Sequence, residues 1–321
     1  MSNYNLIQFL FIYIYIVVMP EINEIKKYAD FLNSILKNKK IIGINILNGR
    51  YKKHKPFQLY KELKNHLPLK VIDIKTKGKF LYINFEKKIN KYTLFSTLGL
   101  SGGWVYFKNN NFYFPLENNF LDKKIVSTYE RDALNHLNVE FILENRNILY
   151  FYDKLSFGTM KVVDNQEEIN KKLTSIGPDI LNNKTDFKLF FNNIMLEKNR
   201  EKAIGNVLMN QKIISGIGNY LRADILWLSK ISPFRKIKDL SKSEIRKIYK
   251  NMKFLVWSIY DYKEGVKRGF VIKDRKTPFN YNRDFFVYKE ETDIYGHKVI
   301  KEELYEGSKK RFIYWIPEYQ K

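Results

Sequence analysis

SGIGNYLRADILW, residues 215–227, is the stretch of this sequence that says most about the fold. Its two glycines, Gly216 and Gly218, lead directly into a run whose apolar residues recur at helical spacing. The backbone N–H groups of Gly218 and Asn219 would begin that helix, where unsatisfied donors and the helix dipole favour an anion such as a DNA phosphate. A tight turn between two helices, which needs glycine for its φ angles, explains the same residues. The stretch alone leaves both interpretations open.

The overall composition indicates a globular protein with a polyanionic partner. The chain has 321 residues, of which 45% are hydrophobic, so a substantial core can form. It carries 57 Lys and Arg against 34 Asp and Glu, a net charge of +23. This excess favours nucleic acid as the partner first and an anionic membrane second. Cysteine is absent, which excludes disulfides, a thiol nucleophile and a thiolate zinc site, and leaves the redox compartment open.

The first 18 residues differ in character from the rest of the chain. Residues 6–18 are apolar or uncharged, but no Lys or Arg precedes them and no small-residue cleavage site follows, so they are a poor secretory signal. The run is also shorter than the roughly 20 apolar residues that span a bilayer. Three interpretations remain: an upstream start-codon artefact, a buried extra strand, or a weak membrane anchor.

The remaining chain changes its periodicity twice. Helical spacing from Glu21 to Leu36 predicts an amphipathic helix, with Pro20 at its first turn. Residues 41–163 then give short β-rich runs, including a hairpin around 144–147, and predict an antiparallel sandwich or barrel. Residues 186–198, 200–210, 217–229 and 241–262 are predicted helices, with Asp186 and Ser241 as N-caps. The last segment, 277–321, returns to β-rich runs, so the fold class is α+β.

Six blocks of the sequence, in order, resemble the formamidopyrimidine-DNA glycosylase/endonuclease VIII family. They cover the chain from Met19 to its end, and the form GIGNYLRADIL is most similar to the Nei-like branch of the family. The blocks are MPEINEI (19–25), KTKGKFLYINF (75–85), TLGLSGGW (97–104), VEFILENRNILYFYDKLSFGTMKV (139–162), LMNQKIISGIGNYLRADILWLSKISPF (208–234) and RFIYWIPEYQK (311–321).

The resemblance implies a catalytic role for Pro20, Glu21 and Lys79. Once Met19 is removed, the amine of Pro20 would attack the deoxyribose C1′, expel the damaged base and form an iminium ion that permits β- and δ-elimination. Inside a peptide bond the same nitrogen is an amide and cannot attack, so the leader and this chemistry are incompatible. Glu21 would be the general acid/base and Lys79 would contact a phosphate beside the lesion. The alternative interpretations are structural: Pro20 would be a helix-start proline, Glu21 a carboxylate at the positive end of the helix dipole, and Lys79 a solvated strand lysine.

The resemblance also implies a set of DNA contacts. Asn219, supported by the backbone at Gly218, would bind one flanking phosphate, and Arg311 would bind another. Contacts of this kind bend the duplex and help extrude the target nucleotide. Leu100 and Phe157 would then fill the gap left in the base stack.

Several positions depart from the family pattern. Ile316 and Tyr319 stand where the finger has its last cysteine pair, and His297 alone cannot replace four thiolates, so we expect no metal and no cofactor. Ser156 stands in place of an arginine that reads the orphaned base. Gly205 and Asn210 replace a lysine and an aspartate. The finger would instead be held by hydrophobic packing of Phe286, Tyr288, Ile313, Tyr314 and Trp315.

The sequence therefore predicts a bifunctional DNA glycosylase and abasic-site lyase. Its predicted segments are a leader (1–18), a catalytic β-sandwich domain (19–165), a linker (166–185), a helix-two-turns-helix domain (186–276) and a zincless finger (277–321). The expected partner is double-stranded DNA with oxidised pyrimidines or abasic sites, ring-opened purines being second, and the expected state is a monomer. The rivals are a non-catalytic binder of damaged DNA with a blocked Pro20 and a basic protein tethered to a membrane by residues 6–18.

Overall fold

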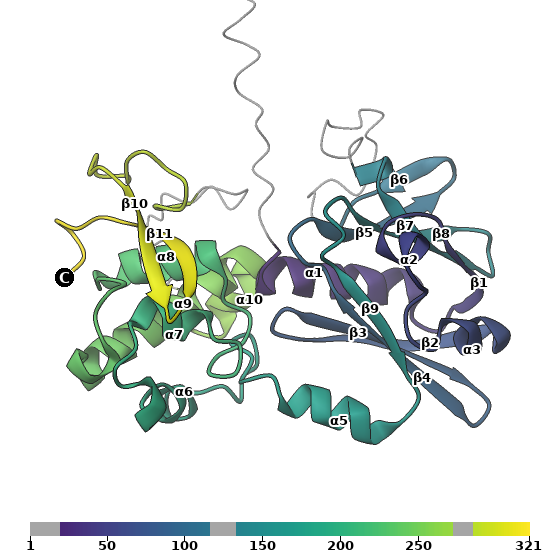
Figure 1. Cartoon of the computed structure of the whole chain (residues 1–321), viewed down its shortest axis with the longest axis horizontal. Coiled ribbons are helices and arrows are strands. Elements are labelled where there is room, and N and C mark those ends of the chain that lie inside the picture. The colour runs from purple at the N-terminus through teal and green to yellow at the C-terminus, as the bar shows by residue number, and fades with distance from the viewer. Residues whose placement is uncertain (1–19, 116–132, 272–284) are drawn as a thin grey trace, which may run out of the picture.

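The computed structural model describes residues 20–115, 133–271 and 285–321, and Figure 1 shows how their elements are arranged. The leader predicted for residues 1–18 lies outside the described residues. The first half contains α1 (Ile22–Leu36), β1 (Lys40–Ile46), α2 (Arg50–Lys53), α3 (Tyr60–Asn65), β2 (Leu69–Lys77), β3 (Phe80–Lys87), β4 (Asn90–Thr97), β5 (Gly102–Lys108), β6 (Asn111–Tyr113), β7 (Leu137–Leu143), β8 (Ile148–Asp153) and β9 (Thr159–Val163). The second half contains α5 (Gln166–Thr174), α6 (Phe187–Ile194), a 3₁₀ turn (Glu197–Asn199), α7 (Ile204–Met209), α8 (Asn219–Ser229), a second 3₁₀ turn (Ile237–Asp239), α9 (Lys242–Tyr260), α10 (Tyr262–Lys267), β10 (Ile300–Glu306) and β11 (Lys309–Trp315).

The nine described strands of the first half form one antiparallel sheet. Their order is β6-β5-β8-β7-β1-β2-β3-β4-β9, and every neighbouring pair is antiparallel. The predicted hairpin turn at 144–147 joins β7 to β8. Inside the sheet, the ring of Trp104 lies 5.7 Å from Phe141 and 5.2 Å from Phe151 between ring centroids, in a fully buried core. The prediction of an antiparallel β-sandwich within an α+β fold is confirmed.

The helical half follows the predicted order, with shorter helices. The helix predicted at 200–210 begins only at Ile204, and the one predicted at 217–229 begins at Asn219. Both predicted N-caps are confirmed, because the Asp186 side chain accepts the N–H of Leu189 at 2.8 Å and the Ser241 hydroxyl accepts that of Glu244 at 3.2 Å. Within the described part of the chain, no helix combines the length and apolar character that a membrane span requires.

Helix α1 lies between the two halves of the molecule (Figure 1). Its first residue, Ile22, is buried in the helical core, whereas Ile25 and Tyr28 are buried in the core of the sheet. Tyr260 at the end of α9 donates a hydrogen bond of 2.6 Å to the Asp30 carboxylate of α1. Pro20 and Glu21, the described residues just before α1, therefore lie where the sheet and the helices meet.

Half of the predicted linker 166–185 is helical. Helix α5 begins at Gln166, and the side chain of Asn165 caps it by accepting the N–H of Glu168 at 2.8 Å. Its apolar residues Ile169 and Leu173, one turn apart, pack against a small buried cluster of the sheet. Helix α5 therefore packs on the sheet and is not a free linker. Sequence analysis identified neither its N-cap nor its apolar residues.

The C-terminal hairpin shares one hydrophobic core with the helices. The five residues predicted to hold the finger all lie in or against that core: Phe286 and Ile313 are buried in it, and Tyr288, Tyr314 and Trp315 pack against it. The predicted boundary at 276/277 lies outside the described residues. Among residues 20–115, 133–271 and 285–321, no three His, Asp or Glu side chains are grouped as a metal site.

Candidate active site at the junction of sheet and helices

The carboxylate of Glu21 occupies the N-terminus of α8. It accepts a hydrogen bond of 2.5 Å from the N–H of Gly218 and one of 3.0 Å from the N–H of Tyr220. Glu21 is 0% exposed. An anion therefore sits at this helix start, as the sequence predicts, but it is a side chain of the protein, and the Gly218 N–H is not free to bind a phosphate.

Two glycines of the SGIG stretch let the chain segments meet here. Gly216 has a φ of +105°, and its carbonyl accepts the N–H of Ile22 at 3.1 Å. Gly218 has extended backbone, but a methyl group on its α carbon would lie 2.2 Å from both the Glu21 carboxylate and the Lys79 amine. The stretch is therefore both a tight turn and an anion-binding helix start, because the turn brings the Glu21 carboxylate to the N-terminus of α8.

Lys79 reaches the same place from the turn between β2 and β3. The turn is tied to the helical half by Asp179, whose carboxylate accepts the N–H of Gly78 at 2.9 Å. Asp179 also forms an isolated parallel bridge with Ser215, the residue before the glycine turn. Sequence analysis placed Asp179 in the predicted linker 166–185 and missed its role; its one signal is a carboxylate within the short segment IGPDIL, residues 176–181.

Burial dominates the electrostatics of the two neighbouring charged groups, Glu21 and Lys79. It raises the pKa of Glu21 to about 7, against the opposing effect of the nearby Lys79 cation. Burial also lowers the pKa of Lys79. The Glu21 carboxylate opposes this shift, and the Arg311 cation adds to it. Glu21 can therefore hold or release a proton near neutral pH, which a general acid/base requires.

A second carboxylate, that of Glu24, holds the backbone of Glu21 and the side chain of Tyr220. It accepts the Glu21 backbone N–H at 2.9 Å and the Tyr220 hydroxyl at 3.0 Å. The Tyr220 hydroxyl in turn accepts from the amide of Asn23 at 3.2 Å. Sequence analysis missed Tyr220 and Asn23, because neither residue type indicates such a contact. The network orients the backbone that follows Pro20, which is itself buried.

The two predicted phosphate-binding residues, Asn219 and Arg311, are joined through Arg222. The Arg222 guanidinium donates to the side-chain oxygen of Asn219 at 3.2 Å and to the carbonyl of Phe312, the neighbour of Arg311, at 2.6 Å. The side chain of Asn219 is partly exposed and Arg311 is exposed. Arg311 also lies close enough to Lys79 to affect its pKa. The finger and the start of α8 thus border the same site.

Leu100 and Phe157 lie on two loops that touch each other. They are 38% and 58% exposed, so both apolar side chains are open to solvent. A methyl group at Gly99 would lie 2.9 Å from the Phe157 side chain. Both loops are held by the buried Asp153, whose carboxylate accepts the Ser101 hydroxyl and the Gly158 N–H, each at 2.6 Å.

The structure gives a physical reason for Gly205, which replaces the family's lysine, and shows the contacts of Asn210, which replaces its aspartate. At Gly205, a side chain would meet the side chain of Leu304 at 2.7 Å and the carbonyl of Pro233 at 3.0 Å. Leu304 of the finger therefore occupies the space that a lysine would need. Asn210 instead makes a local turn, in which its side-chain oxygen accepts the N–H of Lys212 at 3.0 Å.

Comparison with known proteins gives one consistent result. The model of the formamidopyrimidine-DNA glycosylase N-terminal domain matches residues 19–160, and that of the formamidopyrimidine-DNA glycosylase H2TH domain matches residues 176–266. A formamidopyrimidine-DNA glycosylase of Wolbachia pipientis is 29% identical over 72% of this chain and 74% of its own length. One of Lactobacillus gasseri is 26% identical over 87% and 88%.

Solved structures give the same fold. The Lactococcus lactis Fpg in complex with DNA that contains an abasic site is 20% identical, with a TM-score of 0.66, over 94% of this chain and 99% of that one. A MutM in complex with DNA that contains carbocyclic 8-oxo-G is 21% identical, with a TM-score of 0.66, over 94% and 100%. At these identities the similarity establishes the shared fold.

Proposed function

Because this chain belongs to the formamidopyrimidine-DNA glycosylase family, we propose that it is a bifunctional DNA glycosylase and abasic-site lyase of base excision repair. The proposal assigns it to the Nei-like branch, on the form GIGNYLRADIL and the absence of finger cysteines in the sequence. Double-stranded DNA is its partner, and the net charge of +23 supports a polyanionic ligand. Oxidised pyrimidines are the proposed substrates, with ring-opened purines second.

The reaction begins at the amine of Pro20 in a chain whose Met19 has been removed. The nitrogen lone pair forms a bond to C1′ while the bond from C1′ to the base breaks, and the base leaves with that electron pair and a proton. Opening of the sugar ring, with a proton delivered to its oxygen, converts the adduct into an iminium ion. Loss of a C2′ proton then expels the 3′ phosphate, loss of a C4′ proton expels the 5′ phosphate, and water releases the amine.

Glu21 is the proton carrier of this scheme. Its carboxyl directly follows Pro20 in the chain, and burial raises its pKa to about 7, so both protonation states are populated at neutral pH. The protonated form delivers a proton to the ring oxygen, and the ionised form accepts the proton removed from the sugar. Lys79, beside the Glu21 carboxylate, binds the phosphate next to the lesion.

The observation that carries the proposal is the convergence of three chain segments next to Pro20. Glu21 from the start of α1, Lys79 from the turn between β2 and β3, and Gly218 from the start of α8 meet within contact distance. A structural ion pair could explain the two charges, but it gives no reason to bury a carboxylate at neutral pKa beside the residue that the family uses as a nucleophile.

Borohydride reduction tests the proposal on a duplex that contains one abasic site. A chain that starts at Met19, with the methionine removed, is expected to form a stable covalent adduct and to cleave the strand. The matched variant Glu21→Gln keeps the size of the side chain, and we expect it to lose most of the cleavage. A chain that binds the duplex but yields neither adduct nor cleavage would refute the proposed activity.

One observation favours an alternative. Met19 precedes Pro20 in the sequence, so a chain that retains residues 1–19 has an amide nitrogen at Pro20. Such a chain would bind damaged DNA through the same surface without cutting it. The same reduction separates the two functions, because a binder gives a gel shift without an adduct.

A further inference from the structure

Arg222 is a buried cation with only neutral partners in the described structure. Its side chain is 0% exposed. The guanidinium donates to the carbonyls of Phe312 at 2.6 Å and Gly205 at 3.4 Å, and to the side-chain oxygen of Asn219 at 3.2 Å. Among the ion pairs of the described residues, none involves Arg222.

Such a group does not stabilise the fold by its charge. Burial and the nearby Arg311 cation lower the pKa of Arg222 to about 10, against the opposing effect of the Glu21 carboxylate. Removing a cation from water without a carboxylate within ion-pair distance is costly, and an apolar side chain of similar volume is often as stable or more so. The reason for Arg222 must therefore lie in what its hydrogen bonds hold together.

The first bond orients Asn219. The two residues are three positions apart on α8 and so lie on the same face of the helix. A phosphate accepts hydrogen bonds, so only the amine of the Asn219 side chain can bind it. By donating to the side-chain oxygen, Arg222 engages the acceptor end and leaves the amine to donate elsewhere.

The second bond fixes the finger beside Arg311. An isolated two-stranded hairpin is only marginally stable, and this one is anchored through Leu304 of β10 and Ile313 of β11, which are buried against the helices. The bond to the Phe312 carbonyl holds the backbone of β11 at the position next to Arg311. A shift of that peptide would move the Arg311 side chain, which is exposed on β11.

We propose that Arg222 is a positioning residue that sets Asn219 and Arg311 in a fixed relation, so that α8 and the finger bind two phosphates of one DNA duplex together. The inference rests on the proposed DNA-binding function, and it adds a residue that touches neither the reacting atoms nor a phosphate. It predicts that the contribution of Arg311 to DNA binding depends on Arg222.

A double-mutant cycle on salt dependence tests this coupling. The ligand is a duplex with a tetrahydrofuran abasic analogue, which cannot be cleaved, and the affinity is measured at several salt concentrations. Arg311→Ala should lower the slope of log K against log salt by about 0.9, the value for one phosphate contact. Arg222→Met should lower it by about the same amount, with the melting temperature unchanged or raised. In the Arg311→Ala background, Arg222→Met should leave the slope unchanged.

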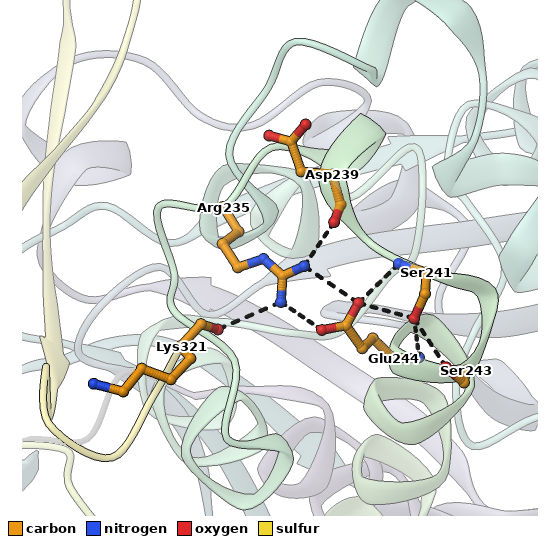
Figure 2. A network of polar contacts seen from close by, with 6 residues as sticks. All are labelled: Arg235, Asp239, Ser241, Ser243, Glu244 and Lys321. Carbon is orange, nitrogen blue, oxygen red and sulfur yellow. Dashed lines mark hydrogen bonds and ion pairs between the residues drawn. The ribbon is translucent and has the colours of Figure 1, made fainter.

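Arg235→Met is the matched control. Figure 2 shows that Arg235 also joins the helical half to the end of the chain, by donating to the Lys321 carbonyl at 3.5 Å and the Asp239 carbonyl at 2.6 Å. It also pairs with the carboxylate of Glu244. It does not contact β11 next to Arg311, so its loss should leave the salt slope at the wild-type value.

Two results would overturn the inference. One is a wild-type slope in Arg222→Met. The other is a further loss of slope when Arg222→Met is added to Arg311→Ala, which would mean that Arg222 acts through its own charge. Failure of the proposed function is a separate result, because it appears as the absence of a borohydride adduct in the wild-type chain, while the cycle uses a ligand that undergoes no chemistry.

Discussion

Replacing Gly218 by alanine should disable the site while leaving the fold intact. The added methyl group would lie 2.2 Å from the Glu21 carboxylate and 2.2 Å from the Lys79 amine, so both groups must move by about 1 Å to reach ordinary contact. Lys79 can swing away, but the Glu21 carboxylate is held by two backbone N–H groups. The extended backbone at Gly218 is open to alanine without strain, with φ at −127°.

A displacement of about 1 Å in a catalytic group can lower a rate by roughly a hundredfold. Single-turnover cleavage of an abasic duplex, at protein concentrations that saturate the DNA, should therefore fall by about that factor in Gly218→Ala. Gly43→Ala is the control, because its methyl group would meet the side chain of Ile142 in the sheet, 2.9 Å from Cδ1 and 3.2 Å from Cβ, and no group of the proposed site. A Gly218→Ala rate within threefold of the Gly43→Ala rate, with both chains folded, would refute the geometry proposed for the site.

Three further predictions follow from the same structure. Burial raises the pKa of Glu21 from 4.5 to about 7, so the folded chain holds a proton that the unfolded chain has released; stability should fall with rising pH across this window and level off above it. Denaturant unfolding of wild type and Glu21→Gln between pH 5 and 8 checks this, since the wild type should lose roughly 1 kcal/mol per pH unit relative to the variant, and parallel curves would contradict it. Metal analysis should find no stoichiometric zinc, and chelators should leave cleavage unchanged, because the chain has no cysteine. If Leu100 and Phe157 fill the gap as proposed, they do so without reading base edges, so excision of one oxidised pyrimidine opposite A, C, G and T should vary within about tenfold. A spread beyond about a hundredfold would require a reader of the orphaned base.

The architecture was predictable because the periodicity of the sequence changes where the structure changes. Short β-rich runs in 41–163, with no helices between them, indicated the antiparallel sheet, and side-chain caps such as Asp186 and Ser241 marked helix starts that the structure contains. Helix α5 was missed, because its apolar residues Ile169 and Leu173 are only two in a polar segment. Two apolar residues do not indicate a buried helix face unless the cluster of the sheet that covers them is known.

The candidate site was predictable in its residue types but not in its contacts. Motif resemblance selected Glu21, Lys79 and Gly218, which the structure brings together from separate parts of the chain. That the helix N-terminus at Gly218 receives the Glu21 carboxylate in place of a phosphate depends on tertiary packing, which local sequence does not encode. Supporting residues such as Asp179 and Arg222 act on backbone atoms of distant segments, and no spacing in the sequence reveals such a partnership.

Peptide mapping of the borohydride-trapped adduct tests the central claim most directly. The chain that starts at Met19, with that methionine removed, and a chain that keeps residues 1–18 would each be reduced with abasic DNA, with intact mass used to verify both N-termini. The account predicts an adduct in the first chain alone, attached to the nitrogen of Pro20. Attachment to a lysine such as Lys79, or equal adduct yields from the two chains, would contradict it.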